Sequence, residues 1–164
     1  MKNTNRIGIG FIGGGFITRF HIKSLIGVRD CDVIGVMSKT RSSADESCAL
    51  SKELGVGEAK PYNSVTDMVS DPAINALWIC APNFTRLEIM EEIVNAIESG
   101  KGELIGIACE KPLGRNVKEA KQMLALAKKV DLLDGYLENQ VFAPSVTKGK
   151  EIIWERGAST TGRP

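Results

Sequence analysis

Short apolar runs recur along the chain at intervals too wide for hairpins, and this spacing most limits the possible folds. The runs are RIGIGFI (6–12), CDVIGVM (31–37), NALWICA (75–81), ELIGIAC (103–109) and DLLDGYLE (131–138). Amphipathic stretches with apolar residues at helical spacing lie between them, over 17–27, 43–55, 85–100 and 116–130. Strands without polar alternation, each followed by a helix, are typical of a parallel sheet covered by helices on both faces. The sequence therefore predicts a doubly wound α/β fold with about six strands.

Residues typical of helix ends flank several of these stretches. Gly55 follows the second predicted helix, and glycine is common just after a helix C-terminus. Thr85 with Glu88 has the pattern of a capping box, in which the first side chain accepts a bond from a first-turn amide. Asn116 with Glu119 repeats the pattern. We therefore expect Thr85 and Asn116 to cap the helices that follow them.

Composition excludes several classes of partner. Lysine plus arginine (21) nearly cancels aspartate plus glutamate (20), so no basic excess indicates nucleic acid. Aromatic residues make up only 5% of the chain, too few for a base-stacking platform. No apolar run reaches the roughly 18 residues of a membrane span, and the N-terminal MKNTN lacks a signal-peptide core. We expect a cytoplasmic protein of one domain that binds neither nucleic acid nor membrane.

The four cysteines give no indication of a metal site. Cys31, Cys48, Cys80 and Cys109 are far apart and form no C-x-x-C or Cys/His pair. Cys80 and Cys109 lie in apolar runs, which is typical of buried thiols in a reducing compartment. We therefore expect no metal ligands among them.

Two overlapping glycine patterns compete for the role of a phosphate-binding loop. Residues 8–13 form a literal G-x-G-x-x-G, whereas residues 13–18 form an imperfect copy with Thr18 in place of the third glycine. A phosphate loop must follow the first strand and open the next helix, where main-chain amides and the helix dipole face the anion. Gly8 and Gly10 lie inside the predicted strand. The second pattern is therefore the better candidate.

The candidate dinucleotide loop runs from Gly13 to Ile17. The tight turn falls on Gly13, Gly14 and Gly15, and the helix is expected to begin near Phe16. A glycine at the middle position lets a pyrophosphate approach the backbone, while the third position sets helix–strand packing. Thr18 then implies a slightly wider contact, eased by Gly8 and Gly10 in the facing strand. Similar loops also occur in methyltransferases and in plain structural turns.

The loop after the second strand indicates which dinucleotide is preferred. An acid about 20 residues past the glycine loop would bind the ribose 2′-OH of NAD. The loop instead consists of Ser38, Lys39, Thr40 and Arg41, and no acid occurs before Asp45. Cations and hydroxyls at a helix N-terminus suit a 2′-phosphate. We predict NADP as the preferred cofactor and NAD as the alternative; a solvated polar loop is the competing interpretation.

The tripeptide Glu110-Lys111-Pro112 follows directly after an apolar strand. Together with the glycine loop and ICAPNFTR (79–86), it resembles the glucose–fructose oxidoreductase, inositol dehydrogenase and rhizopine-catabolism family of oxidoreductases. The resemblance covers essentially the whole chain but only the N-terminal half of the family. It implies a Rossmann domain over residues 1–141. Residues 142–164 would then be a helix and the start of the crossover to the family's second α/β domain, which is absent.

The resemblance also implies roles for individual residues. Lys111 would project toward the nicotinamide and substrate, and Ala81, Pro82 and Asn83 would line the cofactor side of the cleft. YLENQVFAP (136–144) matches the family's segment after the last strand, which makes Asn139 and Gln140 candidate pocket residues.

Two positions bear on how far the resemblance extends. His21 matches a histidine often found in the family's first helix, and we interpret it as a packing residue. Arg86 stands where the family commonly has a histidine. This departure weakens inferences about packing around the nicotinamide.

The chemistry expected at the predicted strand ends agrees with the resemblance. Ligands of open parallel sheets bind beyond the carboxyl ends of the strands, where Gly13, Ser38, Ala81 and Glu110 are predicted to lie. A partly desolvated lysine at that edge can act as a general acid or base while the cofactor carries the hydride. Lys111 would then move the carbinol proton, and Glu110 would orient the Lys111 side chain. The competing interpretation is a surface lysine in a turn set by Pro112.

Two functions of different class follow. The first is a dehydrogenase or reductase that acts on a sugar, a polyol or a derivative, here represented by its cofactor domain. The second is a non-catalytic module that binds or senses a dinucleotide, and a methyltransferase is a distant third. A truncated or frameshifted family member and a free-standing module are both compatible with the length. An apolar face around Ile152, Ile153 and Trp154 would favour self-association, which makes a homo-oligomer an expected form.

Overall fold

A computed structural model describes residues 6–155 of the chain, and its centre is a six-stranded sheet. The strands are β1 (Ile7–Ile12), β2 (Cys31–Met37), β3 (Lys60–Tyr62), β4 (Ala76–Ile79), β5 (Gly106–Glu110) and β6 (Leu133–Leu137). Their order is β3-β2-β1-β4-β5-β6, and every neighbouring pair is parallel. The order reverses between β1 and β4, which is where ligands bind in sheets of this topology.

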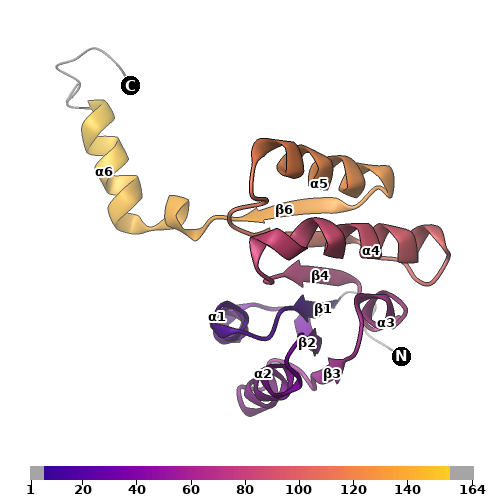
Figure 1. The fold of residues 1–164 in the computed structure, drawn as a ribbon. Coiled ribbons are helices and arrows are strands. Elements are labelled where there is room, and N and C mark those ends of the chain that lie inside the picture. Colours follow the sequence, from indigo (N-terminus) through magenta and orange to yellow (C-terminus); the bar gives the residue numbers. More distant parts are fainter. Residues whose placement is uncertain (1–5, 156–164) are drawn as a thin grey trace.

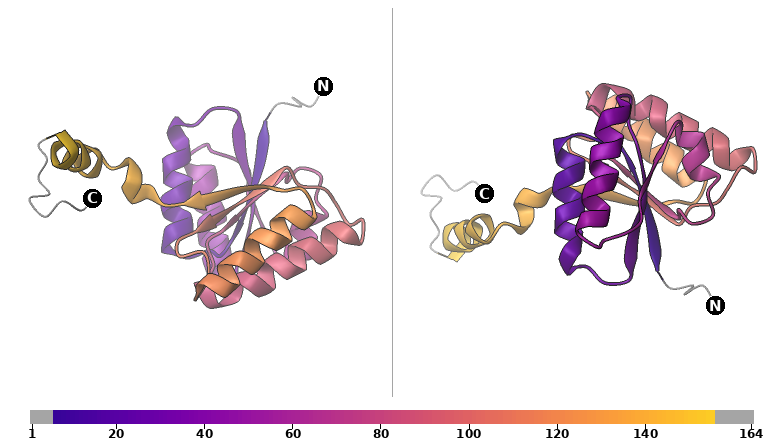
Figure 2. Two further views of the ribbon diagram at one scale, coloured as in Figure 1. Left: turned by 90° about the horizontal axis from the view of Figure 1, so that it is seen from above. Right: turned by 90° about the horizontal axis from the view of Figure 1, so that it is seen from below.

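Helices cover both faces of the sheet, which confirms the predicted doubly wound fold. They are α1 (Phe16–Ser24), α2 (Arg41–Glu53), α3 (Val65–Val69), α4 (Arg86–Glu98), α5 (Val117–Lys129) and α6 (Pro144–Glu155). Within residues 6–155, the connections also contain three short 3₁₀ helices, η1 (Leu25–Gly27), η2 (Asn83–Thr85) and η3 (Asn139–Phe142). Figure 2 shows α1 and α2 on one face and α4 and α5 on the other.

Each face of the sheet has its own apolar core. Side chains alternate along a strand, so Phe11 of β1 packs under α1 and α2, whereas Ile12 packs on the opposite face. The core under α1 and α2 includes Ile9, Phe11, Ile22, Val33, Val36 and Cys48. The core under α3, α4 and α5 includes Ile12, Met68, Leu77, Ile79, Met90, Ile93 and Met123. These two layers fix the strand ends that carry the candidate site.

The third strand and the short helix after it are absent from the apolar pattern of the sequence. Strand β3 has only three residues, lies at the edge of the sheet and contains Pro61, which edge strands tolerate. Its neighbour β2 supplies the pairing, with Gly35 opposite Lys60. A strand this short and polar lacks the apolar run on which the prediction depended.

One of the two predicted helix caps is present and the other is wrong. The Asn116 side chain accepts a hydrogen bond from the Glu119 amide at 3.0 Å, as predicted for the start of α5. Thr85, however, has helical dihedral angles because η2 precedes α4, and it makes no side-chain cap. Its hydroxyl donates to the Pro82 carbonyl at 2.8 Å instead.

The C-terminal part of the described chain is much less buried than the rest. Strand β6 exposes Leu133 and Tyr136, and α6 has no buried residue. Figure 1 shows α6 extending away from the layered body, after η3. The domain boundary placed at residue 141 stays a prediction, and the last part of the predicted crossover, residues 156–164, lies outside the described residues.

Candidate functional site

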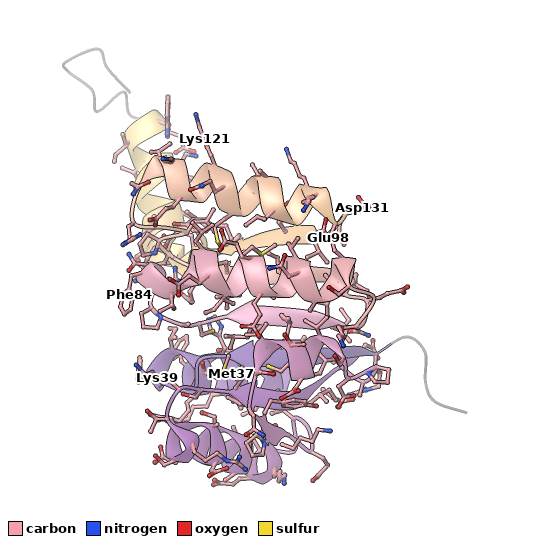
Figure 3. The ribbon with its side chains drawn as sticks, turned by 45° about the vertical axis from the view of Figure 1, so that its right-hand side comes forward. Met37, Lys39, Phe84, Glu98, Lys121 and Asp131 are labelled. Carbon is pink, nitrogen blue, oxygen red and sulfur yellow. The ribbon has the colours of Figure 1, made fainter. Side chains whose placement is uncertain are left out.

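The residues singled out in the sequence gather at one edge of the sheet, because parallel strands end on the same side. Gly13 follows β1, and its amide donates to the carbonyl of Met37, the last residue of β2, at 2.7 Å. The Cys80 amide, just after β4, donates to the carbonyl of Ile12 at 2.8 Å. Figure 3 labels Lys39 and Phe84 at this edge, with Glu98 and Asp131 at the opposite edge. The edge is the expected place for a ligand.

The three loop glycines differ in what their positions demand. Gly13 has φ of 106°, and a Cβ there would lie 2.9 Å from the Ala81 nitrogen. A Cβ on Gly14 would lie 2.7 Å from the Ser43 carbonyl, at the start of α2. A Cβ on Gly15 would meet no protein atom within 4 Å. Packing within the chain therefore requires the first two glycines but leaves open space beside the third.

In the glycine loop, the main-chain carbonyls accept hydrogen bonds from side chains of the protein, whereas the amides at the start of α1 have no side-chain cap. The Gly13 carbonyl accepts from the Thr18 hydroxyl, and the Gly14 carbonyl accepts from the Ser47 hydroxyl at 3.1 Å. The Arg19 amide makes the first bond of α1, to Gly15 at 3.2 Å. First-turn amides have no acceptor within a helix, and Gly15 offers no side-chain cap. Such an end suits an anion.

The expectation that Gly8 and Gly10 ease the contact at Thr18 is wrong, whereas the wider contact itself stays a prediction. Thr18 is fully buried, and its hydroxyl closes the glycine loop through the Gly13 carbonyl. Gly8 and Gly10 do not face α1. A Cβ on Gly8 would clash with the Ala73 carbonyl, and one on Gly10 would lie 2.5 Å from Met68 Cε, on the opposite face of the sheet. These two strand glycines serve core packing, and neither lies in the loop.

The loop after β2 lies beside the glycine loop and carries cations and hydroxyls. Ser38 is half-buried, whereas Lys39 and Thr40 are exposed. Thr40 precedes α2 without a side-chain cap, so the first turn of α2 also has uncapped amides. Arg41 belongs to α2 itself, and its Nε lies 3.0 Å from Asp45 Oδ1. Both cations are therefore exposed, and Arg41 in addition shares an ion pair.

The end of β5 forms a small polar network. Glu110 is 7% exposed; its Oε2 accepts from the Lys111 amide at 3.0 Å, and its Oε1 lies 2.8 Å from His21 Nε2. The His21 ring packs edge-on against Trp78, with centroids 5.1 Å apart. His21 therefore packs between α1 and the sheet, as predicted, and in addition joins Glu110. Glu110 holds the main chain of Lys111.

The Lys111 side chain itself is exposed. The partial desolvation expected of it is thus not provided by the described residues of this chain. Burial instead affects the neighbouring thiol: it raises the pKa of Cys80 to about 12, so that this group stays protonated at neutral pH. At the end of β5, the exposed Lys111 is open to a ligand from solvent, whereas Glu110 is buried.

Arg86 is the residue of this site that sequence reasoning undervalued. Its side chain is 5% exposed, and its guanidinium donates to the carbonyls of Ala81 (2.8 Å), Glu110 and Pro112. The arginine therefore joins the turn after β4 to the turn after β5. A cation in the first turn of a helix opposes the helix dipole. That conflict was the available signal that Arg86 needs acceptors elsewhere.

A pocket of about 270 Å³ opens beside this network, between α1 and the end of β6. His21 and Glu110 line it together with Phe20, Tyr136 and Asn139. Asn139 and Gln140 are exposed, and Asn139 begins η3. Ala81, Pro82 and Asn83 lie across the edge, with Ala81 buried and Asn83 half-buried. The structure thus brings the predicted residues to one edge, from the loop after β2 to η3.

The strand order and the loops at this edge are those of a Rossmann-type domain. Residues 7–134 match the model of the GFO_IDH_MocA group, described as an oxidoreductase family with an NAD-binding Rossmann fold. The chain belongs to this family, as the resemblance in the sequence indicated. Among residues 6–155, no helix has the length and apolar character needed to cross a membrane.

Individual relatives agree with this assignment. The chain is 30% identical over 156 residues to a myo-inositol 2-dehydrogenase from Thermotoga maritima, covering 95% of the chain and 42% of that protein. A structure of scyllo-inositol dehydrogenase from Lactobacillus casei with NAD(H) and scyllo-inositol has the same fold (TM-score 0.71, 22% identity, 94% and 42% coverage). So does a 3-ketoreductase from Actinomadura kijaniata in complex with NADP and TDP-benzene (TM-score 0.74, 18% identity, 92% and 43% coverage). The chain spans less than half the length of each.

Proposed function

We propose that this chain is the cofactor-binding domain of an oxidoreductase that transfers hydride between a nicotinamide dinucleotide and a sugar, a polyol or a derivative. Family membership supports the dinucleotide, because the family has an NAD-binding Rossmann fold. The substrate class is suggested by relatives named for inositols. Because the chain spans less than half of these relatives, the activity belongs to a protein that also supplies a substrate site.

The observation that carries the cofactor proposal is the open space at Gly15. A glycine whose Cβ would meet nothing is not needed for packing, yet this one precedes the uncapped first turn of α1. A pyrophosphate can approach the main chain there only if no side chain fills the space. Gly13, Gly14, Phe16 and Ile17 would complete this cradle. The residues of this loop therefore fit the pyrophosphate of a dinucleotide.

The decisive experiment is a fluorescence titration with NADPH of the wild-type chain and two matched variants. Gly15→Val should lower affinity at least about 100-fold, because its side chain fills the phosphate space. Gly27→Val is the control, since a Cβ at Gly27 also meets no atom within 4 Å but lies at the end of η1, which follows the C-terminus of α1. It should leave the affinity unchanged. Equal losses in both variants, or wild-type protein that binds no NADPH, would contradict the proposal.

The same titration addresses the choice of cofactor. We propose NADP as the preferred form, with the 2′-phosphate bound by Ser38, Lys39 and Thr40 at the start of α2, and Arg41 beside them. A charge-assisted pair contributes about 1.5–3 kcal/mol, so NADPH should bind about 10- to 150-fold more tightly than NADH. Lys39→Ala should reduce this ratio, whereas Lys52→Ala, in the last turn of α2, should not. A ratio of one in the wild type would refute the preference.

In the reaction itself, the bound cofactor would supply hydride chemistry and the chain would supply position and a proton path. Lys111 would take the carbinol proton as the neutral amine, and its ammonium form would return the proton in the reverse direction. Glu110 would keep the Lys111 main chain in place through its bond to the Lys111 amide. General acid–base help of this kind is worth roughly 10²–10⁴-fold when the substrate is held within hydrogen-bond reach. Ala81, Pro82, Asn83 and Asn139 would border the nicotinamide.

A second candidate is a module that binds the dinucleotide without catalysis. The exposure of Lys111 favours it, because none of the described residues covers this amine. We expect the chain to bind NADPH but to show negligible turnover of sugars or inositols, since orientation of the substrate can be worth about 7–11 kcal/mol of the barrier. The test follows NADP⁺ reduction over a panel of polyols. Turnover near about 1–10³ s⁻¹ that is lost in Lys111→Ala would show a complete enzyme.

A further inference from the structure

Arg86 holds the turn that carries Lys111, from a position on a different strand–helix unit. Its Nη1 donates to the carbonyls of Glu110 and Pro112, and its Nη2 lies 3.5 Å from the Lys111 carbonyl. Its Nε donates to Ala81 at 2.8 Å. One side chain thus binds three consecutive carbonyls, from the last residue of β5 into the turn that follows, and one carbonyl after β4.

The chemistry of arginine suits this arrangement and that of lysine does not. Guanidinium carries five N–H donors in a planar fork, whereas an ammonium offers three donors around one point. The buried charge at the start of α4 opposes the helix dipole, so it is tolerated only because carbonyl oxygens surround it. This set of carbonyl acceptors therefore requires the planar guanidinium group, and a positive charge alone is not sufficient.

The Lys111 main chain is held from both sides. Glu110 Oε2 accepts from the Lys111 amide, and Arg86 binds the carbonyls on the other side of the turn. Glu110 itself lies 2.8 Å from His21 on α1. The Lys111 side chain is left free while its main chain is fixed against β4, β5 and α1.

We propose that Arg86 is a positioning residue that presets Lys111 for the nicotinamide end of the cofactor. This inference rests on the function proposed above. The arginine fixes the turn after β5 against the Ala81–Asn83 turn. It does not affect the phosphate loop or the part of the site that would bind the adenine half of the cofactor. The loop after β2 and Gly13–Ile17 make none of the hydrogen bonds described for Arg86.

The first test needs no cofactor and uses ¹⁵N relaxation of the whole chain. In the wild type, the Lys111 amide should have an order parameter near about 0.85, typical of rigid backbone. Arg86→Lys keeps the charge but loses the fork, and should lower that value below about 0.6. The Gly13 amide, bonded to Met37, should not change. Arg29→Lys, at an exposed position, is the control. An unchanged Lys111 amide in Arg86→Lys would overturn the inference.

The second test separates the two ends of the cofactor. Arg86→Lys should weaken NADPH about tenfold while 2′,5′-ADP, which lacks the nicotinamide half, stays within about twofold of wild type. A merely structural effect would weaken both probes alike and would overturn the positioning role, as would an unchanged NADPH affinity. Wild-type protein that binds neither probe would instead refute the proposed function, with which this role falls. The relaxation data then tell whether the arginine still holds the turn.

Discussion

Strands β1 and β6 belong to one sheet but differ sharply in burial. Five of the six residues of β1 are buried, whereas none of the five residues of β6 is. Two cores enclose β1, one on each face, while β6 is an edge strand that pairs with β5 alone. The half of the sheet around β1 therefore carries most of the folding stability. Strand β6 itself exposes apolar side chains such as that of Leu133, which add little to it.

The largest test of this difference compares two leucines in the same sheet. Leu77 of β4 is 0% exposed and Leu133 of β6 is 71% exposed. Leu77→Ala should lower the free energy of unfolding by about 2–5 kcal/mol, because it leaves a cavity in a closed core. Leu133→Ala should change it by no more than about 0.5 kcal/mol. Urea denaturation of both variants measures the contrast, and similar losses would mean that β6 is stabilised as strongly as β4.

A pair of strand glycines gives a smaller effect with opposite signs. A Cβ on Gly8 of β1 would overlap the main-chain carbonyl of Ala73, whereas one on Gly135 of β6 would keep 3.6 Å from its nearest neighbour. Gly8→Ala should therefore cost about 1–3 kcal/mol by overpacking. Gly135→Ala should be neutral or stabilising by up to about 1 kcal/mol, because alanine restricts the unfolded chain.

Thermal unfolding of both glycine variants at one pH gives the comparison. Destabilisation by Gly135→Ala as large as that by Gly8→Ala would show that β6 is packed more closely than its exposure indicates. NADPH titration should also be run on Gly10→Ala. Gly10 lies in β1 outside the phosphate loop, so Gly10→Ala should leave the NADPH affinity nearly unchanged. Its Cβ would lie 2.5 Å from Met68 Cε, so a loss of stability must be separated from a loss of affinity.

The same contrast explains what the sequence could predict. The fold follows from apolar runs with regular spacing, and these are the buried strands β1, β2, β4 and β5 together with β6. Strand β3 has no such run: it pairs with β2, and two of its three side chains, Lys60 and Tyr62, hydrogen-bond to Asp71. No local pattern announces a strand that depends on a partner eleven residues later in the chain.

In the candidate site too, local sequence predicts some residues and not others. The position of the glycine loop follows from the strand that precedes it, so local sequence sufficed to choose Gly13–Ile17 over the literal motif. Arg86 could not be placed, because its acceptors Glu110 and Pro112 lie 24 and 26 residues away. Spacing along one chain segment cannot show which carbonyls meet across two strand ends. The roles assigned to these residues stay predictions until a ligand is bound.

The smallest predicted effect concerns pH and a polar contact that substitutes for apolar packing at the β3 edge. Hydrogen bonds from the Lys60 ammonium (2.8 Å) and the Tyr62 hydroxyl (2.6 Å) lower the pKa of Asp71 from its usual 3.8 to about 2. Burial is the main cause that raises the pKa of Tyr62 to about 12, so its hydroxyl remains a donor. Because the folded pKa is the lower one, the carboxylate stabilises the fold above about pH 4.

This contribution should be lost as the pH falls from about 4 through about 2, since both states are then protonated. We expect it to amount to about 1–2 kcal/mol, reduced by solvent because Asp71 is 19% and Lys60 60% exposed at the side chain. Asp71→Asn should therefore be less stable than wild type at neutral pH and equal to it near about pH 2. Asp134→Asn in β6 is the control and should stay within about 0.5 kcal/mol of wild type. The measurement is the urea midpoint of each protein across this pH range. If wild type remains more stable than Asp71→Asn at about pH 2, the difference arises from the shape of the side chain and the charge has no role.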